Sequence, residues 1–272
     1  MSDLPKRLAS GLVLGIVFAI SAWLGGFVFI ALLCAASCVI WFEWCGIRMP
    51  HLDDRLLLAG ALTIIAMALV LWLASGWWFW ALLLIPPAFF CISAIKLGQT
   101  ASIKGLLYAA ILMVSLGHLR GVGDNWAGFI SICFLCAVVF ATDIGAYFVG
   151  RSLGGPKLWP AISPNKTISG AAGGLFIAMI AATLTYVAFG LSPVWIAACL
   201  AALLSVVAQC GDLYESWIKR RAGVKDSGRL IPGHGGVMDR VDGLLFAAFG
   251  LWLSSVVAGH WLIPANTFFA VG

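Results

Sequence analysis

The chain has 272 residues, of which 62% are apolar and only 10% are charged, and its mean hydropathy is +1.06. Since an ordinary soluble domain is about 45–50% apolar and about 25% charged, the composition excludes a soluble globular domain, a disordered chain, a disulfide-rich secreted module and a coiled coil. Charged residues are missing from 9–42, 56–95, 167–211 and 243–272. Because about 20 apolar residues cross a bilayer as a helix, the sequence predicts an all-α, polytopic integral membrane protein.

Breaks at glycine, proline and charged residues divide the chain into about nine predicted transmembrane helices. The first apolar run has no cleavage-site pattern after it, so we interpret it as a retained span and not as a signal peptide. The fifth is expected to be short or tilted, because Lys104 and Arg120 limit it. The predicted spans are 8–24, 27–47, 56–74, 77–95, 105–119, 126–149, 168–189, 193–213 and 241–263.

The basic residues orient these spans. With nine spans, every Lys and Arg except Arg120 falls on one face, and the positive-inside rule makes that face, with the N-terminus, cytoplasmic. Topology alone explains most of the net charge of +5; attraction to anionic lipid or to a polyphosphate is the alternative. We therefore expect a multi-pass protein of the inner, cytoplasmic membrane.

Two long cytoplasmic loops, 150–167 and 214–240, interrupt a chain of otherwise tight connections. Long polar loops in such a protein usually carry function. We therefore divide the chain into N-terminal transmembrane helices at 1–119, which form either a dimer surface or a wall for lipid access, and a C-terminal catalytic transmembrane region at 120–272.

Acidic residues lie at the cytoplasmic ends of the predicted spans. Asp143 in the sixth span is costly in lipid, so it should face the bundle interior or a wet cavity, unless it reaches the interface as a helix-end acid. If the eighth helix continues, Asp212, Glu215, Ser216 and Lys219 share one face at i, i+3, i+4 and i+7. This row fits a hard-cation site and a salt bridge from Glu215 to Lys219 equally well.

A glycine-rich stretch precedes Asp239 and Asp242, which begin the ninth span. Glycines such as Gly235 and Gly236 let backbone N–H groups approach a phosphate closely, and His234 either binds phosphate or holds the glycine turn. Acids in a first helical turn also suit the helix dipole. The interleaved cations favour a metal–polyphosphate site over a solvated face; they are Lys219, Arg220, Arg221, Lys225, Arg229 and Arg240.

The segment 216–242 resembles the signature of the phosphatidate cytidylyltransferases, also known as CDP-diacylglycerol synthases. Its pattern is Ser and Lys-Arg, then Lys-Asp, then Pro-x-His-Gly-Gly, then Asp-Arg-x-Asp. The sequences at 211–215, 143–151 and 163–167 also fit this family. One departure is Ser169, because the family usually has a glutamate at this place before the glycine.

The resemblance implies an integral membrane enzyme that condenses CTP with phosphatidic acid to give CDP-diacylglycerol and pyrophosphate in phospholipid synthesis. It further implies a divalent metal, taken here as one or two Mg²⁺ ions, a homodimer, and a site open to the cytoplasm. The partners expected are CTP, phosphatidic acid and the lipid bilayer, with no nucleic acid.

This reaction brings a lipid phosphate up to a triphosphate, so positioning and charge neutralisation matter more than a strong base. Mg²⁺ commonly takes one or two carboxylates together with substrate phosphates. Asp212 and Asp239 are the first-choice metal ligands, followed by Asp143, Glu215 and Asp242. The catalytic candidates are Lys219, Lys225 and Asp226, and the substrate-binding candidates are Ser163, Lys166, Ser216, Arg220, His234, Gly235, Gly236 and Arg240.

Three alternatives remain at this point. CDP-archaeol synthases and CTP-dependent polyprenol kinases share a nucleotide and a membrane setting; the complete signature argues against the kinases, and a comparison of acceptor lipids would separate the archaeol enzymes. A transporter would place its charges near the membrane midplane, usually with an internal repeat, and the acids here cluster at one boundary. A purely structural protein would explain the small-residue patterns at 11–15 and 170–173, but not the charged loop.

Overall fold

The computed structural model describes residues 4–74, 78–121, 125–231, 235–259 and 262–270, with side chains from Ser10 onward. Long helices occupy all nine predicted spans within these residues, and eight of them are long and apolar enough to cross a membrane. The ninth contributes a shorter apolar helix, Ser10–Leu24. The polytopic all-α prediction is therefore confirmed. The helices are α1 (Leu4–Leu24), α2 (Gly26–Arg48), α3 (Asp54–Leu73), α4 (Trp78–Lys96), α5 (Ala101–Arg120), α6 (Trp126–Leu153), α7 (Ile168–Ala188), α8 (Val194–Arg221), α9 (Met238–Val257) and α10 (Asn266–Phe269).

Several helices are longer than the hydropathy pattern predicted, among them α5, α6 and α8. α5 has 20 residues and takes both limiting cations into its ends, while α6 and α8 each have 28 residues and continue beyond the predicted spans. The loop 150–167 contains a small antiparallel hairpin of β1 (Lys157–Trp159) and β2 (Ser163–Thr167). The extensions of α6 and α8 carry charged residues, which an apolar pattern cannot detect.

The chain forms two compact units. The first comprises Met1–Asp124 with Ala222–Arg240, and the second comprises Asn125–Arg221 with Val241–Gly272. The segment 222–240, which joins α8 to α9, thus packs with the N-terminal helices, and α9 begins in the first unit and continues in the second.

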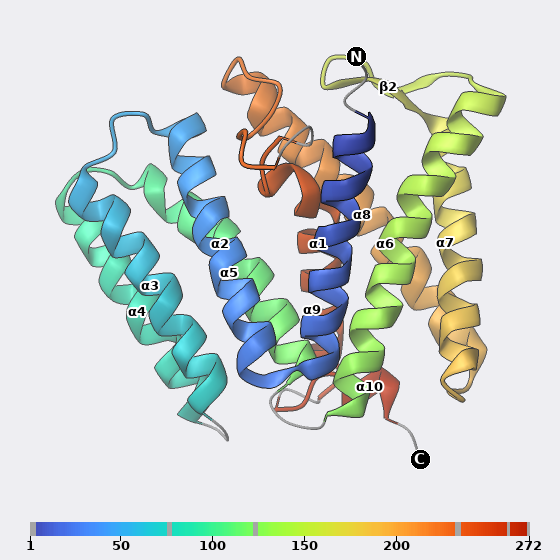
Figure 1. Ribbon diagram of the computed structural model, residues 1–272, viewed down its shortest axis with the longest axis horizontal. Coiled ribbons are helices and arrows are strands. Elements are labelled where there is room, and N and C mark those ends of the chain that lie inside the picture. The colour runs from blue at the N-terminus through green and yellow to red at the C-terminus, as the bar shows by residue number, and fades with distance from the viewer. Residues whose placement is uncertain (1–3, 75–77, 122–124, 232–234, 260–261, 271–272) are drawn as a thin grey trace. The chain divides into compact units, whose positions relative to one another are not determined.

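In the first unit, α2 packs against α1, α3 and α5 (Figure 1). The indoles of Trp41 and Trp44 are buried and lie against Gly60 of α3 and Gly105 of α5, where an added Cβ would overlap the rings. Trp41 Nε1 also donates a hydrogen bond of 2.9 Å to the Leu57 carbonyl. Since buried aromatic side chains dominate core packing, these glycines allow the three helices to close around the two indoles.

Arg120, the cation predicted on the opposite face, joins α5 to α1. Its side chain is only 4% exposed, and it donates to the carbonyls of Ala22 at 2.6 Å and Trp23 at 3.1 Å. The carbonyls at the end of a helix lack intrahelical partners, and a cation there complements the helix dipole. Arg120 therefore serves as a buried cap on α1.

Replacing this cap is expected to destabilise the first unit. Arg120→Met should lower the free energy of unfolding by about 2 kcal/mol, because the carbonyls of Ala22 and Trp23 lose a charged donor and the first of them is buried. Thermal unfolding in detergent measures the effect, with Arg55→Met as the control because the Arg55 side chain is exposed. Equal unfolding midpoints for the two variants would contradict the capping role.

In the second unit, α6 and α7 lie side by side (Figure 1). An added Cβ on Gly174 would lie 2.6 Å from the Thr142 carbonyl oxygen of α6, so the two backbones approach as closely as small residues permit. α8 joins this pair through a 2.8 Å hydrogen bond from Thr142 Oγ1 to Ser205 Oγ, and Gln209 Nε2 donates to the Ala171 carbonyl at 3.3 Å. The three helices thus form a closely packed base for the loops that follow them.

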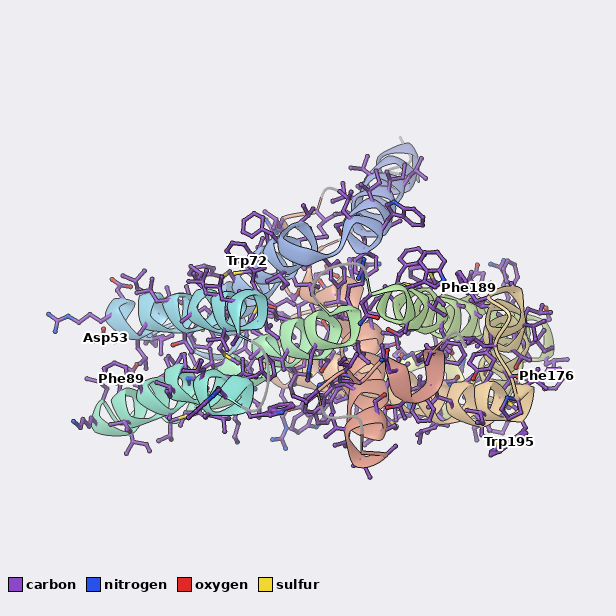
Figure 2. All side chains as sticks on the ribbon, turned by 90° about the horizontal axis from the view of Figure 1, so that it is seen from below. Asp53, Trp72, Phe89, Phe176, Phe189 and Trp195 are labelled. Carbon is purple, nitrogen blue, oxygen red and sulfur yellow. The ribbon has the colours of Figure 1, made fainter. Side chains whose placement is uncertain are left out.

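Large apolar side chains point outward from both units, as Figure 2 shows for Phe89, Phe176 and Trp195. These three are 73%, 63% and 64% exposed. Water would penalise so much exposed apolar area, whereas lipid tails would not. The outward-facing residues therefore agree with a protein surrounded by the hydrocarbon of a bilayer.

Candidate functional site

A cavity of about 750 Å³ lies in the second unit, where the ends of α6 and α8 meet the hairpin and the start of α7. Its volume is within the range of small-molecule sites. Acidic, basic and neutral polar groups line it together: Asp143, Asp212, Arg151, Lys157, Lys166, Asn165, Thr167 and Gln209. The cavity therefore offers both carboxylate oxygens and cationic donors, which a phosphorylated ligand with a metal ion requires.

Local hydrogen bonds shape the rim of this cavity. α6 ends at Leu153 and is followed by Gly154, whose φ is +63°, and Arg151 Nη1 donates to the Tyr147 hydroxyl at 2.8 Å. Thr167 caps α7 by accepting from the Gly170 N–H at 3.1 Å. Ser169, the departure from the family pattern, donates to the Gly154 carbonyl and lies 3.1 Å from Thr167 Oγ1, so it joins the end of α6 to the start of α7.

Three acids converge in the second unit. Asp143 of α6 and Asp212 of α8 line the cavity, and Lys166 of the hairpin forms an ion pair with Asp212. Asp242 of α9 lies within electrostatic range of both acids and of Lys219, and its Oδ1 accepts from the Gly243 N–H at 2.7 Å. The position of Asp143 on a cavity is the one expected for an acid inside a membrane span.

α8 continues past Asp212, so the predicted row of polar residues does lie on one helix. Glu215 is completely buried and pairs with Lys219, with 2.6 Å between Oε2 and Nζ. This is the salt-bridge interpretation of the row. Ser216 is half-buried and Arg220 is exposed on the same helix.

The carboxylates of the second unit fit a magnesium ion whose remaining coordination positions are filled by the substrate. Among the residues that the structure describes, no three Asp, Glu, His or Cys side chains are grouped closely enough to bind an ion. Mg²⁺ needs only one or two carboxylates, because phosphate oxygens and water fill its remaining positions. Asp143 and Asp212 supply these on the cavity wall. Since Lys166 already pairs with Asp212, a metal must share that carboxylate with the ammonium or replace it.

Asp239 lies in the first unit and closes the loop that precedes it. It is 9% exposed, and its Oδ2 accepts from the N–H groups of Ser227 at 2.8 Å and Gly236 at 2.9 Å. Gly235 has a φ of +83°, and a Cβ there would lie 2.7 Å from the same oxygen. The sequence predicted that the Gly236 N–H could bind a phosphate. In the structure it donates to the Asp239 carboxylate of the protein itself.

The remaining predicted residues are distributed over both units. Lys225, Asp226 and Arg240 are exposed in or beside the segment 222–240. Ser163 is half-buried at the start of β2. His234 lies outside the described residues.

Glu43 of α2 is a site residue that the sequence analysis missed. Its Oε1 accepts from the Val237 N–H at 2.9 Å, and its Oε2 accepts from the Met238 N–H at 2.8 Å and from Ser227 Oγ at 3.3 Å. One signal was available: Glu43 is an acid inside an apolar span, directly after the charge-free run 9–42, and such acids are rarely without a function.

Comparison with known proteins finds a family and relatives that match this chain over nearly its whole length. The model of the cytidylyltransferase family matches residues 5–257. The phosphatidate cytidylyltransferase of Brucella suis biovar 1 (strain 1330) is 42% identical over 275 residues, covering 99% of this chain and 100% of the relative. The chain also matches two enzymes of the same name over shorter lengths. The one from Bacillus subtilis (strain 168) is 52% identical over 44% of this chain and 45% of the relative. The one from Staphylococcus aureus (strain COL) is 45% identical over 50% of this chain and 53% of the relative.

Proposed function

Because the chain belongs to the cytidylyltransferase family, we propose that it transfers CMP from CTP to phosphatidic acid, giving CDP-diacylglycerol and pyrophosphate for phospholipid synthesis. The observation that carries this conclusion is the match to a phosphatidate cytidylyltransferase at 42% identity across 99% of the chain. The chain is therefore a membrane-embedded nucleotidyltransferase, and both of its units belong to the enzyme.

The reaction forms a bond between a phosphate oxygen of the lipid and the α-phosphorus of CTP, while the bond from that phosphorus to the β-phosphate oxygen breaks. A phosphomonoester loses its second proton at about pH 6, so the lipid nucleophile is already mostly deprotonated at neutral pH. The barrier arises chiefly from bringing two polyanions together, and positioning and charge neutralisation lower it.

The cavity of the second unit supports the binding and neutralisation of the lipid phosphate. Lys166, Lys157 and Arg151 present cations to it, and these can neutralise phosphate oxygens while the planar guanidinium binds two of them at once. The cavity is bordered by exposed apolar residues such as Leu158 and Tyr147. A lipid phosphate can therefore reach these cations while its acyl chains stay in the bilayer.

The segment 222–240 supports the binding and neutralisation of the triphosphate of CTP. Lys225 and Arg240 are exposed there, and we assign them to the triphosphate and to the leaving pyrophosphate. Asp226 follows Lys225 directly, and we assign it the role of orienting Lys225 or Lys219. Lys219 is paired with Glu215, which fixes its ammonium on α8 for charge neutralisation.

Magnesium is the proposed cofactor, with one or two ions. When bound, Mg²⁺ would neutralise phosphate charge and orient the leaving group. Asp143 and Asp212 would hold it on the cavity wall, and Asp242 lies within electrostatic range of both, so that the repulsion among the three acids favours a cation nearby. Asp239 and Glu215 are secondary candidates, because neither lines the cavity and the carboxylate of each is held by a partner in the protein.

The remaining proposals concern assembly and location. The chain is a multi-pass membrane protein, and we place it in the inner membrane with its site facing the cytoplasm, because the basic loops lie on one predicted face and the relatives are bacterial. A homodimer is proposed on the family resemblance.

A panel of acceptor lipids tests this function. Purified protein in detergent is incubated with CTP, Mg²⁺ and either phosphatidic acid, an archaeal-type ether phospholipid precursor or a polyprenol, and the lipid products are identified by mass spectrometry. Formation of CDP-diacylglycerol from phosphatidic acid is the expected result. Cytidylylation of the ether lipid alone, or phosphorylation of the polyprenol, would overturn it.

A further inference from the structure

We propose that Glu43 of α2 is a positioning residue for the reaction, holding the signature segment 222–240 in the arrangement that binds the nucleotide. The kinetic part of this inference rests on the proposed function, whereas the contact itself does not. Glu43 is separated by more than half of the chain from the segment that it binds, and it is not part of the signature pattern.

Both carboxylate oxygens of Glu43 are used. Oε1 accepts from the Val237 N–H at 2.9 Å, and Oε2 accepts from the Met238 N–H at 2.8 Å. These N–H groups lie at the start of α9, where they have no carbonyl partner within the helix. Hydrogen bonds from a helix N-terminus to a carboxylate are charge-assisted and stronger than neutral ones. The carboxylate therefore fixes the point at which the loop becomes helix.

Ser227 connects this contact to the rest of the segment. Its hydroxyl donates to Glu43 Oε2 at 3.3 Å, while its N–H donates to Asp239 Oδ2 at 2.8 Å. The two ends of the loop are thus held by two carboxylates, one from α9 itself and one from a different helix. Asp239 closes the loop, and Glu43 ties the closed loop to α2.

Glycines show that the segment is shaped around the Glu43 side chain. A Cβ on Gly228 would lie 2.8 Å from Glu43 Oε1, and a Cβ on Gly236 would overlap both the Glu43 carboxylate and the Ser227 hydroxyl. A side chain at either position would push the backbone away from the acid. The close approach therefore needs these glycines, and it explains why an acid is tolerated within the apolar helix α2 despite its cost in a membrane.

The functional consequence follows from what the segment carries. Arg229 is exposed between the two clamped ends, and Lys225 and Asp226 are exposed directly before Ser227, so the backbone of the segment determines where their side chains can reach. Loss of the Glu43 contact should leave the chemical groups intact but scatter their positions. We expect this to weaken CTP binding more than it slows the chemical step.

The test compares the native protein with Glu43→Gln, which keeps the shape of the side chain but turns an NH₂ group toward a backbone N–H. Asp53→Asn is the matched control, because Asp53 caps α3 in the same unit by accepting from the Arg55 N–H at 2.7 Å and does not touch the segment. KM for CTP and kcat are measured with phosphatidic acid, and the rate of tryptic cleavage after Lys225 and Arg229 is followed separately without substrate.

In Glu43→Gln, KM for CTP should rise about tenfold or more, with a smaller change in kcat, because a charge-assisted contact is lost. Cleavage after Lys225 and Arg229 should accelerate, and Asp53→Asn should resemble the native protein in both measurements. Native values of KM and cleavage rate in Glu43→Gln would overturn the inference, as would a lower kcat with unchanged KM, which indicates only less folded enzyme.

Two further outcomes are separated by design. If Glu43→Gln cannot be purified folded, Ser227→Ala decides instead: it removes one donor to Glu43 and should raise KM for CTP and the cleavage rate in the same direction, and native values would refute the inference. If the native protein shows no CTP-dependent activity, the proposed function fails, while the cleavage rates still test the Glu43 contact.

Discussion

Asp212→Asn is expected to lower the phosphatidate-dependent turnover of CTP by about 100-fold or more, the effect typical of losing a key electrostatic group at a phosphoryl-transfer site. Asp212 lies on the cavity wall, pairs with Lys166, and is in electrostatic range of Asp242. Replacing its carboxylate with an amide removes one of the negative charges that would hold a cation there. Turnover is measured as pyrophosphate release in detergent.

Two further variants show whether the loss of turnover in Asp212→Asn reflects a lost metal ligand. Asp54→Asn changes an exposed acid in the first turn of α3 and should retain native turnover. Lys166→Met breaks the same ion pair from its other side. If Asp212 serves as a metal ligand, Asp212→Asn alone should need more Mg²⁺ for half-maximal rate. Equal Mg²⁺ requirements in all variants would show that Asp212 only orients Lys166.

Removal of divalent metal is expected to abolish turnover almost completely. Without a cation, the triphosphate would have to approach the negative charges of Asp143, Asp212 and Asp242 directly, and like charges brought close together repel strongly. Chelator in excess should stop product formation, and added Mg²⁺ should restore it. Chelator already saturated with Mg²⁺ is the control, and circular dichroism checks that the helices persist. Undiminished turnover in excess chelator would contradict the metal assignment.

The helices could be predicted well from the sequence because a bilayer leaves few alternatives. Every backbone polar group within the hydrocarbon must be satisfied locally, so an apolar run of sufficient length becomes a helix. Some predicted spans were too short at the ends where the helices carry charged residues. α8, for example, continues beyond the predicted end at residue 213 through Glu215 and Lys219 to Arg221. There an ion pair one turn apart supports the helix, and hydropathy gives no signal.

The candidate site was less predictable, because its contacts join residues far apart in the chain. The charged loop and its acids were visible as residues out of place, and the family resemblance named their chemistry. The pairing of Lys166 with Asp212 and the contact of Glu43 with Val237 and Met238 depend on tertiary packing. No local periodicity encodes them, although an acid within the apolar α2 was a signal for the second.

The most direct test of the central claim follows two isotopic labels. Native protein in vesicles containing phosphatidic acid is given Mg²⁺ and CTP carrying ³²P at either the α- or the γ-phosphorus. Transfer of CMP predicts that the α-label enters the lipid and that the γ-label leaves as pyrophosphate. A γ-label found in the lipid would identify a CTP-dependent kinase, and both labels remaining in soluble products would show that this chain does not join CTP to lipid.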